Sequence, residues 1–130
     1  MTASTLLVIL CLIFAQLSVG RKVSVMASPA TIYVDGNNVS GPWNGTSAYP
    51  YRNITSALGN SASGDTIFVR SGVYYESIVI NQTIALVGAS AAQTIIDGSL
   101  NTTLSVISIV GAVGASVREF TITNSRDFTT

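Results

Sequence analysis

The sequence predicts an all-β chain of the solenoid class, in which short strands stack in successive turns of the chain. Residues 64–88 (GDTIFVRSGVYYESIVINQTIALVG) hold three short β-branched runs, at Thr66–Val69, Ile78–Ile80 and 83–87, and show no helical period. The segments between these runs also lack the two-residue Asn-Gly or Asp-Gly signal of a tight hairpin. A chain that keeps bending in one direction fits both observations better than the alternative, a small antiparallel sandwich.

The amino terminus predicts a secretory signal peptide over residues 1–27. Residues 6–17 (LLVILCLIFAQL) contain one polar residue, and the run is shorter than the roughly 20 apolar residues that span a bilayer. Cleavage is expected after Ala27 or, as the alternative, after Gly20, because small residues precede both positions. The rival interpretation is an uncleaved anchor that extends through Val19, and it is the one way in which the sequence predicts contact with a membrane.

The composition narrows the classes of function. Cys11 is the only cysteine and lies within the apolar run, so the mature chain has no thiol. From residue 28 onward, four scattered arginines face six carboxylates, and a chain with this charge pattern lacks the clustered basic surface that binds nucleic acid. Histidine, the commonest general base and a frequent ligand of transition metals, does not occur. No cofactor is predicted.

Five Asn-x-Ser/Thr sequons lie in the mature chain and are candidate glycosylation sites in a secreted protein. They are Asn38, Asn44, Asn53, Asn81 and Asn101. The alternative is that Asn, Ser and Thr are abundant here as turn formers and match the sequon by chance.

Residues 28–63 are predicted to form an amino-terminal cap. A strand at 31–35 is followed by an aromatic loop at 36–50, which is rich in Gly, Asn, Ser and Pro. A short helix then begins after the N-cap Asn53 and ends at Gly59, with its apolar residues on one face. Because an isolated helix of about two turns is marginal in water, it is expected to dock on the open end of the strand stack.

Residues 64–130 are predicted to form about three coils that are open or truncated at the carboxyl end. Further β runs follow the first stretch, at Thr94–Asp97, 104–110 and 117–123. Ile84 with Ile107, and Ile96 with Arg118, lie a little over twenty positions apart, about one solenoid repeat. An uncapped last coil leaves unpaired backbone groups, which predicts that further coils or another chain dock there.

A series of motifs runs through almost the whole mature chain. They are YVDG (33–36), SGPWNGT (40–46), PYRNITSAL (50–58), GDTIFV (64–69), SGVYYESIVI (71–80), TIALVG (83–88), TIIDG (94–98) and REFTITN (118–124). In this order they resemble the pectin lyase-like right-handed parallel β-helix superfamily. The resemblance implies a right-handed, single-stranded parallel β-helix with a short capping helix. Because this superfamily includes polysaccharide lyases, pectin esterases, polygalacturonases, copper-binding helpers and adhesins, it does not by itself assign an activity.

The resemblance carries over no catalytic residue. The chain matches neither the paired aspartates beside glutamine of the esterases nor the clustered calcium-binding acids of the lyases. Glu76 stands where the esterases have the glutamate of a Gly-x-Tyr-x-Glu corner, which is not assigned a catalytic role. Glu76, Asp97 and Glu119 recur about one coil apart and are weak calcium candidates as a stacked carboxylate ladder; in the alternative each is solvated separately. Asp65 and Asp97 are more simply turn residues whose carboxylates accept from backbone amides.

Three aromatic residues of the cap are the candidate carbohydrate contacts. They are Trp43, Tyr49 and Tyr51, whose faces can stack on sugar rings. In the alternative they cover the exposed end of the coil stack.

The sequence therefore predicts a secreted or cell-surface protein with a structural, adhesive or carbohydrate-contacting role, which meets a polysaccharide or surface glycan and holds no complete active site. The alternative function is the amino-terminal part of a polysaccharide-degrading enzyme, similar to a pectate lyase, pectinesterase or polygalacturonase, whose catalytic coils lie beyond residue 130. Clustered Asp, Arg and Lys on later coils would distinguish this second function from the first.

Overall fold

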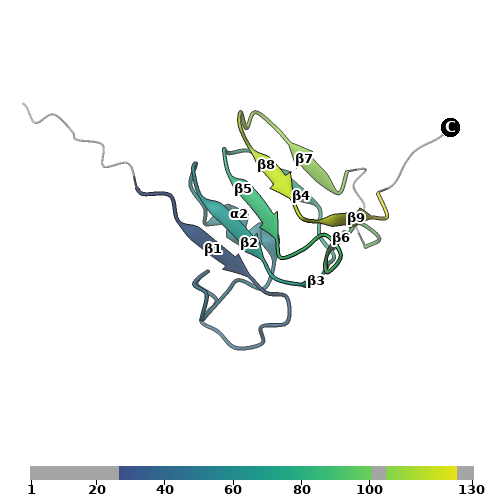
Figure 1. The fold of residues 1–130 in the computed structure, drawn as a ribbon, viewed down its shortest axis with the longest axis horizontal. Coiled ribbons are helices and arrows are strands. Elements are labelled where there is room, and N and C mark those ends of the chain that lie inside the picture. Colours follow the sequence, from purple (N-terminus) through teal and green to yellow (C-terminus); the bar gives the residue numbers. More distant parts are fainter. Residues whose placement is uncertain (1–26, 101–104, 126–130) are drawn as a thin grey trace, which may run out of the picture.

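The structure, a computed structural model, describes residues 27–100 and 105–125. This part of the chain is mainly β, with parallel strands and little helix. Figure 1 shows the strands stacked side by side, from β1 (Thr31–Val34) near the amino-terminal end of the described chain to β8 (Ser116–Arg118) at the far side. Nearly all of the expected signal peptide 1–27, with Cys11, lies outside the described residues, and so does the sequon at Asn101.

The strands form three sheets, and every ladder between the described strands is parallel. The first sheet contains, in order, β1 (Thr31–Val34), β2 (Thr66–Val69), β5 (Ala85–Gly88) and β8 (Ser116–Arg118). The second contains β3 (Gly72–Tyr74), β6 (Thr94–Asp97) and β9 (Thr121–Thr123), and the third pairs β4 (Ile78–Ile80) with β7 (Ile107–Ile109). Consecutive strands along the chain belong to different sheets: β2, β3 and β4 lie in the first, second and third sheet. The next three strands, β5, β6 and β7, follow the same order one layer further on.

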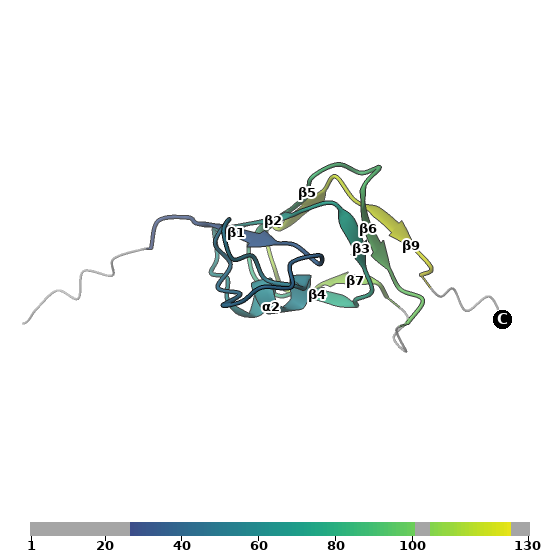
Figure 2. The same ribbon diagram turned by 90° about the horizontal axis from the view of Figure 1, so that it is seen from below.

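The hydrophobic core lies between the three sheets, which surround a common interior in Figure 2. Side chains alternate across each strand, so the same register positions face inward in successive layers. Ile67 lies opposite Leu86 in the ladder of the first sheet, and both are fully buried. In the second sheet, Tyr74 lies opposite Ile96, and both are buried as well. The parallel register therefore stacks apolar side chains into continuous interior columns.

The turn before β2 is fixed by the carboxylate of Asp65, which is buried. Its Oδ1 accepts a hydrogen bond from the backbone N–H of Ala30 at 2.8 Å, and its Oδ2 accepts one from Ala62 at 2.8 Å. The prediction that Asp65 serves a turn is confirmed. Through these bonds the carboxylate also ties the segment before β1 to the turn that leads into β2.

The predicted short helix is α2 (Ile54–Gly59), which packs against β1, β2 and β4. Its N-cap is Asn53, whose side chain accepts a hydrogen bond from the N–H of Ser56 at 2.8 Å. Ile54 and Ala57 are fully buried in the core, which gives this very short helix the tertiary packing that it needs. In Figure 2 the helix lies beside β4, at the edge of the third sheet opposite to β7.

The structure fixes the pairs that the sequence spacing left open, and it corrects one expected strand. Ile107 pairs with Ile78, and Arg118 pairs with Val87. The spacing between paired residues varies, because the connections between layers differ in length. Residues 117–123 were expected as one run, but β8 and β9 belong to different sheets. The chain turns the corner between them at Glu119, whose φ of 62° lies in the left-handed region. β3 was not predicted, because its sequence GVY is short and starts with a glycine.

Two layers approach closely at Gly88, the last residue of β5. A Cβ atom placed on this glycine would lie 2.0 Å from the backbone oxygen of Glu119, at the corner after β8. The position therefore admits only a residue without a side chain.

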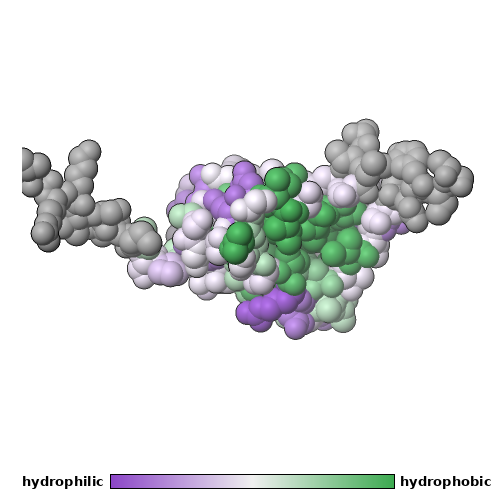
Figure 3. All heavy atoms as spheres, turned by 90° about the horizontal axis from the view of Figure 1, so that it is seen from above, coloured by the Kyte–Doolittle hydropathy of each residue, from purple (hydrophilic) through white to green (hydrophobic). Residues whose placement is uncertain are grey.

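The interior columns end at the last described layer of strands. Ile109 lies opposite the fully buried Ile80, yet it is 50% exposed, and Ile122 lies opposite the fully buried Ile96, yet it is 48% exposed. These two side chains are exposed although they occupy inward-facing register positions, because no described strand lies beyond them. Figure 3 shows a band of hydrophobic residues on one face of the molecule. We call this side of the stack, with β7, β8 and β9 at its edge, the open end.

Candidate functional site

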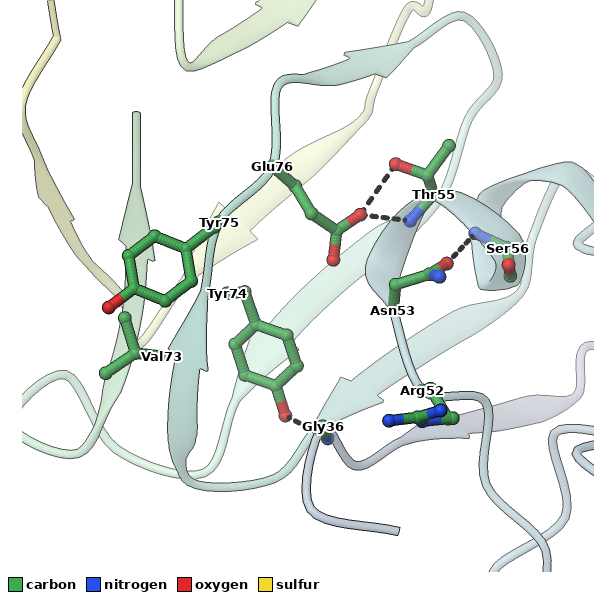
Figure 4. A pocket seen from close by; sticks show the side chains of 9 residues that line it. All are labelled: Gly36, Arg52, Asn53, Thr55, Ser56, Val73, Tyr74, Tyr75 and Glu76. Carbon is green, nitrogen blue, oxygen red and sulfur yellow. Dashed lines mark hydrogen bonds between the residues drawn. The ribbon is translucent and has the colours of Figure 1, made fainter. Parts of the chain in front are cut away.

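A cleft of about 470 Å³ lies between the start of α2 and β3. One wall is formed by Arg52, Asn53, Thr55 and Ser56, and the other by residues 73–76 with Gly36 nearby. Figure 4 shows these side chains, which come from two segments that α2 and the turn after β3 bring together. The residues include cationic, anionic, amide, hydroxyl and aromatic groups, and their hydrogen bonds decide which of them are left for a ligand.

The carboxylate of Glu76 is fully engaged by the beginning of the helix. Its Oε1 accepts a hydrogen bond from the N–H of Ile54 at 2.8 Å, and its Oε2 accepts from the N–H and the hydroxyl of Thr55 at 2.8 and 2.6 Å. Two of the dashed lines in Figure 4 mark the bonds to Thr55. A carboxylate at this end of a helix satisfies N–H groups that have no partner within the helix. Glu76 therefore positions α2 against the sheets.

Tyr74 closes the inner side of the cleft. Its hydroxyl donates to the backbone oxygen of Arg70 at 2.8 Å and accepts from the N–H of Gly36 at 3.3 Å. Burial raises the pKa of the Tyr74 phenol, an effect partly offset by the hydrogen bond from Gly36. The phenol is thus held neutral, with both of its hydrogen-bonding functions used, and it is a structural group. Tyr75 is 53% exposed, and in Figure 4 it points away from α2.

A second cleft of about 190 Å³ adjoins the first. It is lined by Trp43, Tyr51, Arg52, Asn53 and Ser56. Three residues line both clefts, namely Arg52, Asn53 and Ser56. On one side of them lie the aromatic residues of the second cleft, and on the other side lies the β3 wall of the first.

The loop 36–50 holds Trp43 in place against this second cleft. Trp43 itself has a φ of 47°, an uncommon conformation for a residue with a side chain. Next in the loop, Asn44 accepts hydrogen bonds from the N–H and the hydroxyl of Thr46 at 3.1 and 2.8 Å. Gly45 is buried, and a Cβ atom on it would lie 2.7 Å from the ring of Tyr51. The close approach of this glycine and the aromatic ring fixes the base of the loop.

The three predicted carbohydrate-contact residues are only partly brought together. Trp43, which is 40% exposed, and Tyr51 line the same cleft. Tyr51 also packs against the hydrophobic core, so part of its ring covers the interior. Tyr49 is 44% exposed and lines neither of the two clefts. The surface next to Trp43 is instead extended by Arg52, which sequence reasoning did not single out.

The three weak calcium candidates do not form a ladder. Glu76 contacts the helix start, and Asp97 accepts hydrogen bonds from the N–H of Ser99 and the side-chain amide of Asn124, both at 2.8 Å. The hydrogen bonds from Asn124 and Ser99 lower the pKa of the Asp97 carboxyl. Glu119 lies at the corner between β8 and β9. In residues 27–100 and 105–125, no group of three His, Cys, Asp or Glu side chains could hold a metal ion.

The described sequons differ in how their asparagine side chains are used. Asn38 donates from its amide nitrogen to the backbone oxygen of Pro50 at 3.1 Å. Asn44 and Asn53 use only their side-chain oxygens, in the loop and at the helix cap. Asn81 is exposed after β4. Of the four, Asn38 is the one whose amide nitrogen, the atom that would carry a glycan, is already bonded within the fold.

In comparisons with family models, with curated proteins and with solved structures, no match to this chain was found. Within the part of the chain that the structure describes, no helix has the length and apolar character needed to cross a bilayer. The function must therefore be inferred from the geometry of the fold and of the two clefts.

Proposed function

We propose that the chain is a secreted or cell-surface right-handed parallel β-helix protein with an adhesive, carbohydrate-contacting role. The observation that carries this proposal is the surface on which Trp43 and Tyr51 share a cleft with Arg52 and Asn53 at the covered end of a rigid parallel stack. Aromatic faces together with a few polar groups are the usual means by which proteins hold small polar ligands. Strands that meet again in the same sheet after a crossover are connected with a right-handed turn in about 98% of cases, which favours this handedness.

A role in binding rather than in hydrolysis is supported by the groups in the cleft. The acid that the resemblance drew attention to, Glu76, accepts three hydrogen bonds from the helix start, and the phenol of Tyr74 is bonded on both sides. A general acid or base needs a proton that it can exchange with the substrate. Neither residue has such freedom, so in the first cleft Glu76 and Tyr74 act as structural groups.

The open end is the proposed contact with further β-helix coils or with another chain. In the described chain β7, β8 and β9 are edge strands of their sheets, and together with the half-exposed Ile109 and Ile122 these edges favour the addition of another strand layer. We propose secretion through cleavage of the segment 1–27, with glycans on exposed sequons that line neither cleft, such as Asn81. Sequencing the amino terminus of the secreted protein, before and after enzymatic removal of N-glycans, tests both parts of this proposal.

The functional proposal is tested by a carbohydrate screen run in parallel with an assay for chain cleavage. We expect the purified chain to be retained by immobilised glycans and to release no new ends from a uronic-acid polymer. Binding of no carbohydrate at all would contradict the contact role. Cleavage of the polymer would contradict the proposal in favour of a polysaccharide-degrading enzyme.

A further inference from the structure

A cationic residue, Arg52, lines both clefts, in addition to the aromatic and polar groups that contact sugars in general. We propose that the two clefts form one binding site for a sugar that carries an anionic substituent, a carboxylate or a sulfate, with Arg52 as the residue that selects the charge. This inference rests on the proposed carbohydrate-contacting function and adds the class of sugar to it.

The first step of the argument is the state of the arginine side chains. Arg70 is occupied, since it pairs with Asp35 at 3.2 Å and donates to the backbone oxygen of Ser47 at 2.9 Å. Arg52 is exposed and has neither a hydrogen-bond nor an ion-pair partner among the described residues. A guanidinium group presents a planar fork of donors that matches a carboxylate or sulfate. Its donors are thus free for a ligand.

The second step concerns the polar groups beside Arg52. Asn53 uses its side-chain oxygen as the helix cap, while its amide nitrogen has no partner among the described residues. The hydroxyl of Ser56 is likewise free, because the bonds of this residue within the described chain involve its backbone. The free groups shared by both clefts are therefore donors of hydrogen bonds. Donors suit an anion and the hydroxyl oxygens of a sugar ring.

The third step is that the one acid lining the clefts, Glu76, already has its oxygens hydrogen-bonded within the fold. Glu76 directs both of its oxygens at the helix start, and the first N–H groups of α2 are thereby occupied as well. The N–H groups of Ile54 and Thr55 are therefore not available to an anionic ligand, and the cation that lines both clefts is Arg52. Trp43, which lines the second cleft and is 40% exposed, leaves ring surface for the apolar face of the sugar.

The test uses three small glycans that share a core: lactose, sialyllactose and sulfated lactose. Because Asn53 is also a sequon, the protein is produced in a host that attaches no N-glycans. We expect both charged glycans to bind about tenfold more tightly than lactose, as one charge-assisted contact implies, and to lose this advantage at high salt. The ratio of the dissociation constants of sialyllactose and sulfated lactose then shows whether the site prefers a carboxylate or a sulfate.

Arg52→Gln and Arg118→Gln form a matched pair of variants. Arg118 is also exposed and without a partner among the described residues, but it lies in β8 and lines neither cleft. Arg52→Gln should abolish the difference between charged and neutral glycans, whereas Arg118→Gln should leave it unchanged. Trp43→Ala should weaken the binding of all three glycans by the same factor. Circular dichroism of each variant checks that the fold is retained.

The outcomes separate the two proposals. Equal binding of lactose and the charged glycans, or equal effects of the two arginine variants, overturns the anionic site while the carbohydrate-contacting role stands. If no glycan of this set or of the wider screen binds, both the anionic site and the carbohydrate-contacting role are overturned.

Discussion

Tyr74 and Tyr75 are neighbours in sequence, but alternation along and after β3 gives them opposite environments. Tyr74 is 3% exposed and joins the backbone of Arg70 to that of Gly36, whereas the ring of Tyr75 is largely in solvent. A buried hydroxyl that bridges two backbone groups stabilises the fold mainly because its loss leaves those groups without partners. The two residues therefore allow a direct comparison of a structural and a surface phenol.

Replacing Tyr74 with Phe should lower the free energy of unfolding by about 1–2 kcal/mol, because the Arg70 oxygen and the Gly36 N–H both lose a partner. Tyr75→Phe is the control and should change stability by less than about 0.5 kcal/mol. Urea unfolding of the wild type and both variants measures the difference. Equal midpoints for the two variants would show that the bridge contributes nothing.

Among the elements, α2 is held by a residue that is distant in sequence. An isolated helix of its length would be marginal, and its first N–H groups find their acceptor in Glu76, after β3. The Glu76 carboxylate thus links the helix to the strand stack in the way that a local capping residue would link it to its own first turn.

Glu76→Gln should destabilise the protein by about 1–2 kcal/mol, because the amide replaces one acceptor oxygen by a donor that faces the N–H and hydroxyl groups of the helix start. Hydrogen exchange at the amides of Ile54 and Thr55 should accelerate more than exchange in β5. Glu119→Gln, at an exposed corner, is the matched control and should affect neither measurement. Unchanged protection of Ile54 and Thr55 in the Glu76 variant would argue against this cap.

The contact between β5 and the corner after β8 makes a second prediction at the scale of elements. Gly88→Ala should destabilise by about 1–3 kcal/mol, because the added methyl group would meet the Glu119 oxygen and force the two layers apart. Gly59→Ala has open space around the new Cβ and should leave stability unchanged or raise it by up to about 1 kcal/mol. Thermal unfolding compares the two variants. If both alanines had the same effect, the tight packing of these layers would be disproved.

The sequence predicted the elements that local patterns define. β2, β4 and β6 were predicted at the observed bounds, and α2 was predicted from its N-cap Asn53 and its stop signal. The pairing of the later layers was not predictable, because register depends on the lengths of the connections, and these vary. Of the site, Trp43 and Tyr51 were identified by type, but their proximity to Arg52 depends on how the loop 36–50 folds against the helix. A cation next to a helix cap is too common in sequences to have indicated this site.

At the scale of the whole molecule, the two ends of the stack are unlike. α2 lies against β1, β2 and β4, and the loop before it bonds to β1, whereas the open end leaves inward-facing aliphatic side chains in solvent. An edge of this kind is prone to pair with other strands. The expected behaviour in solution is association that depends on concentration and on the apolar residues of the last layer.

Ile109→Lys should reduce this association, because a charge at an inward-facing position opposes the stacking of another layer. Val79→Lys is the matched control: Val79 is 57% exposed in β4 of the same sheet, but its neighbours Ile78 and Ile80 are the buried residues of that strand. Sedimentation velocity over a range of concentrations measures both variants. Equal suppression by the two lysines would locate the contact on the outer face instead.

The unlike ends give the molecule a direction. A duplication of strands within the array could be accommodated at the uncovered side without disturbing Trp43 or Arg52, since those residues lie with the helix at the opposite side. Lengthening the stack would then carry the proposed sugar-contacting site farther from the opposite end. The length of the strand stack and the residues of the clefts could in this way change independently of each other during evolution.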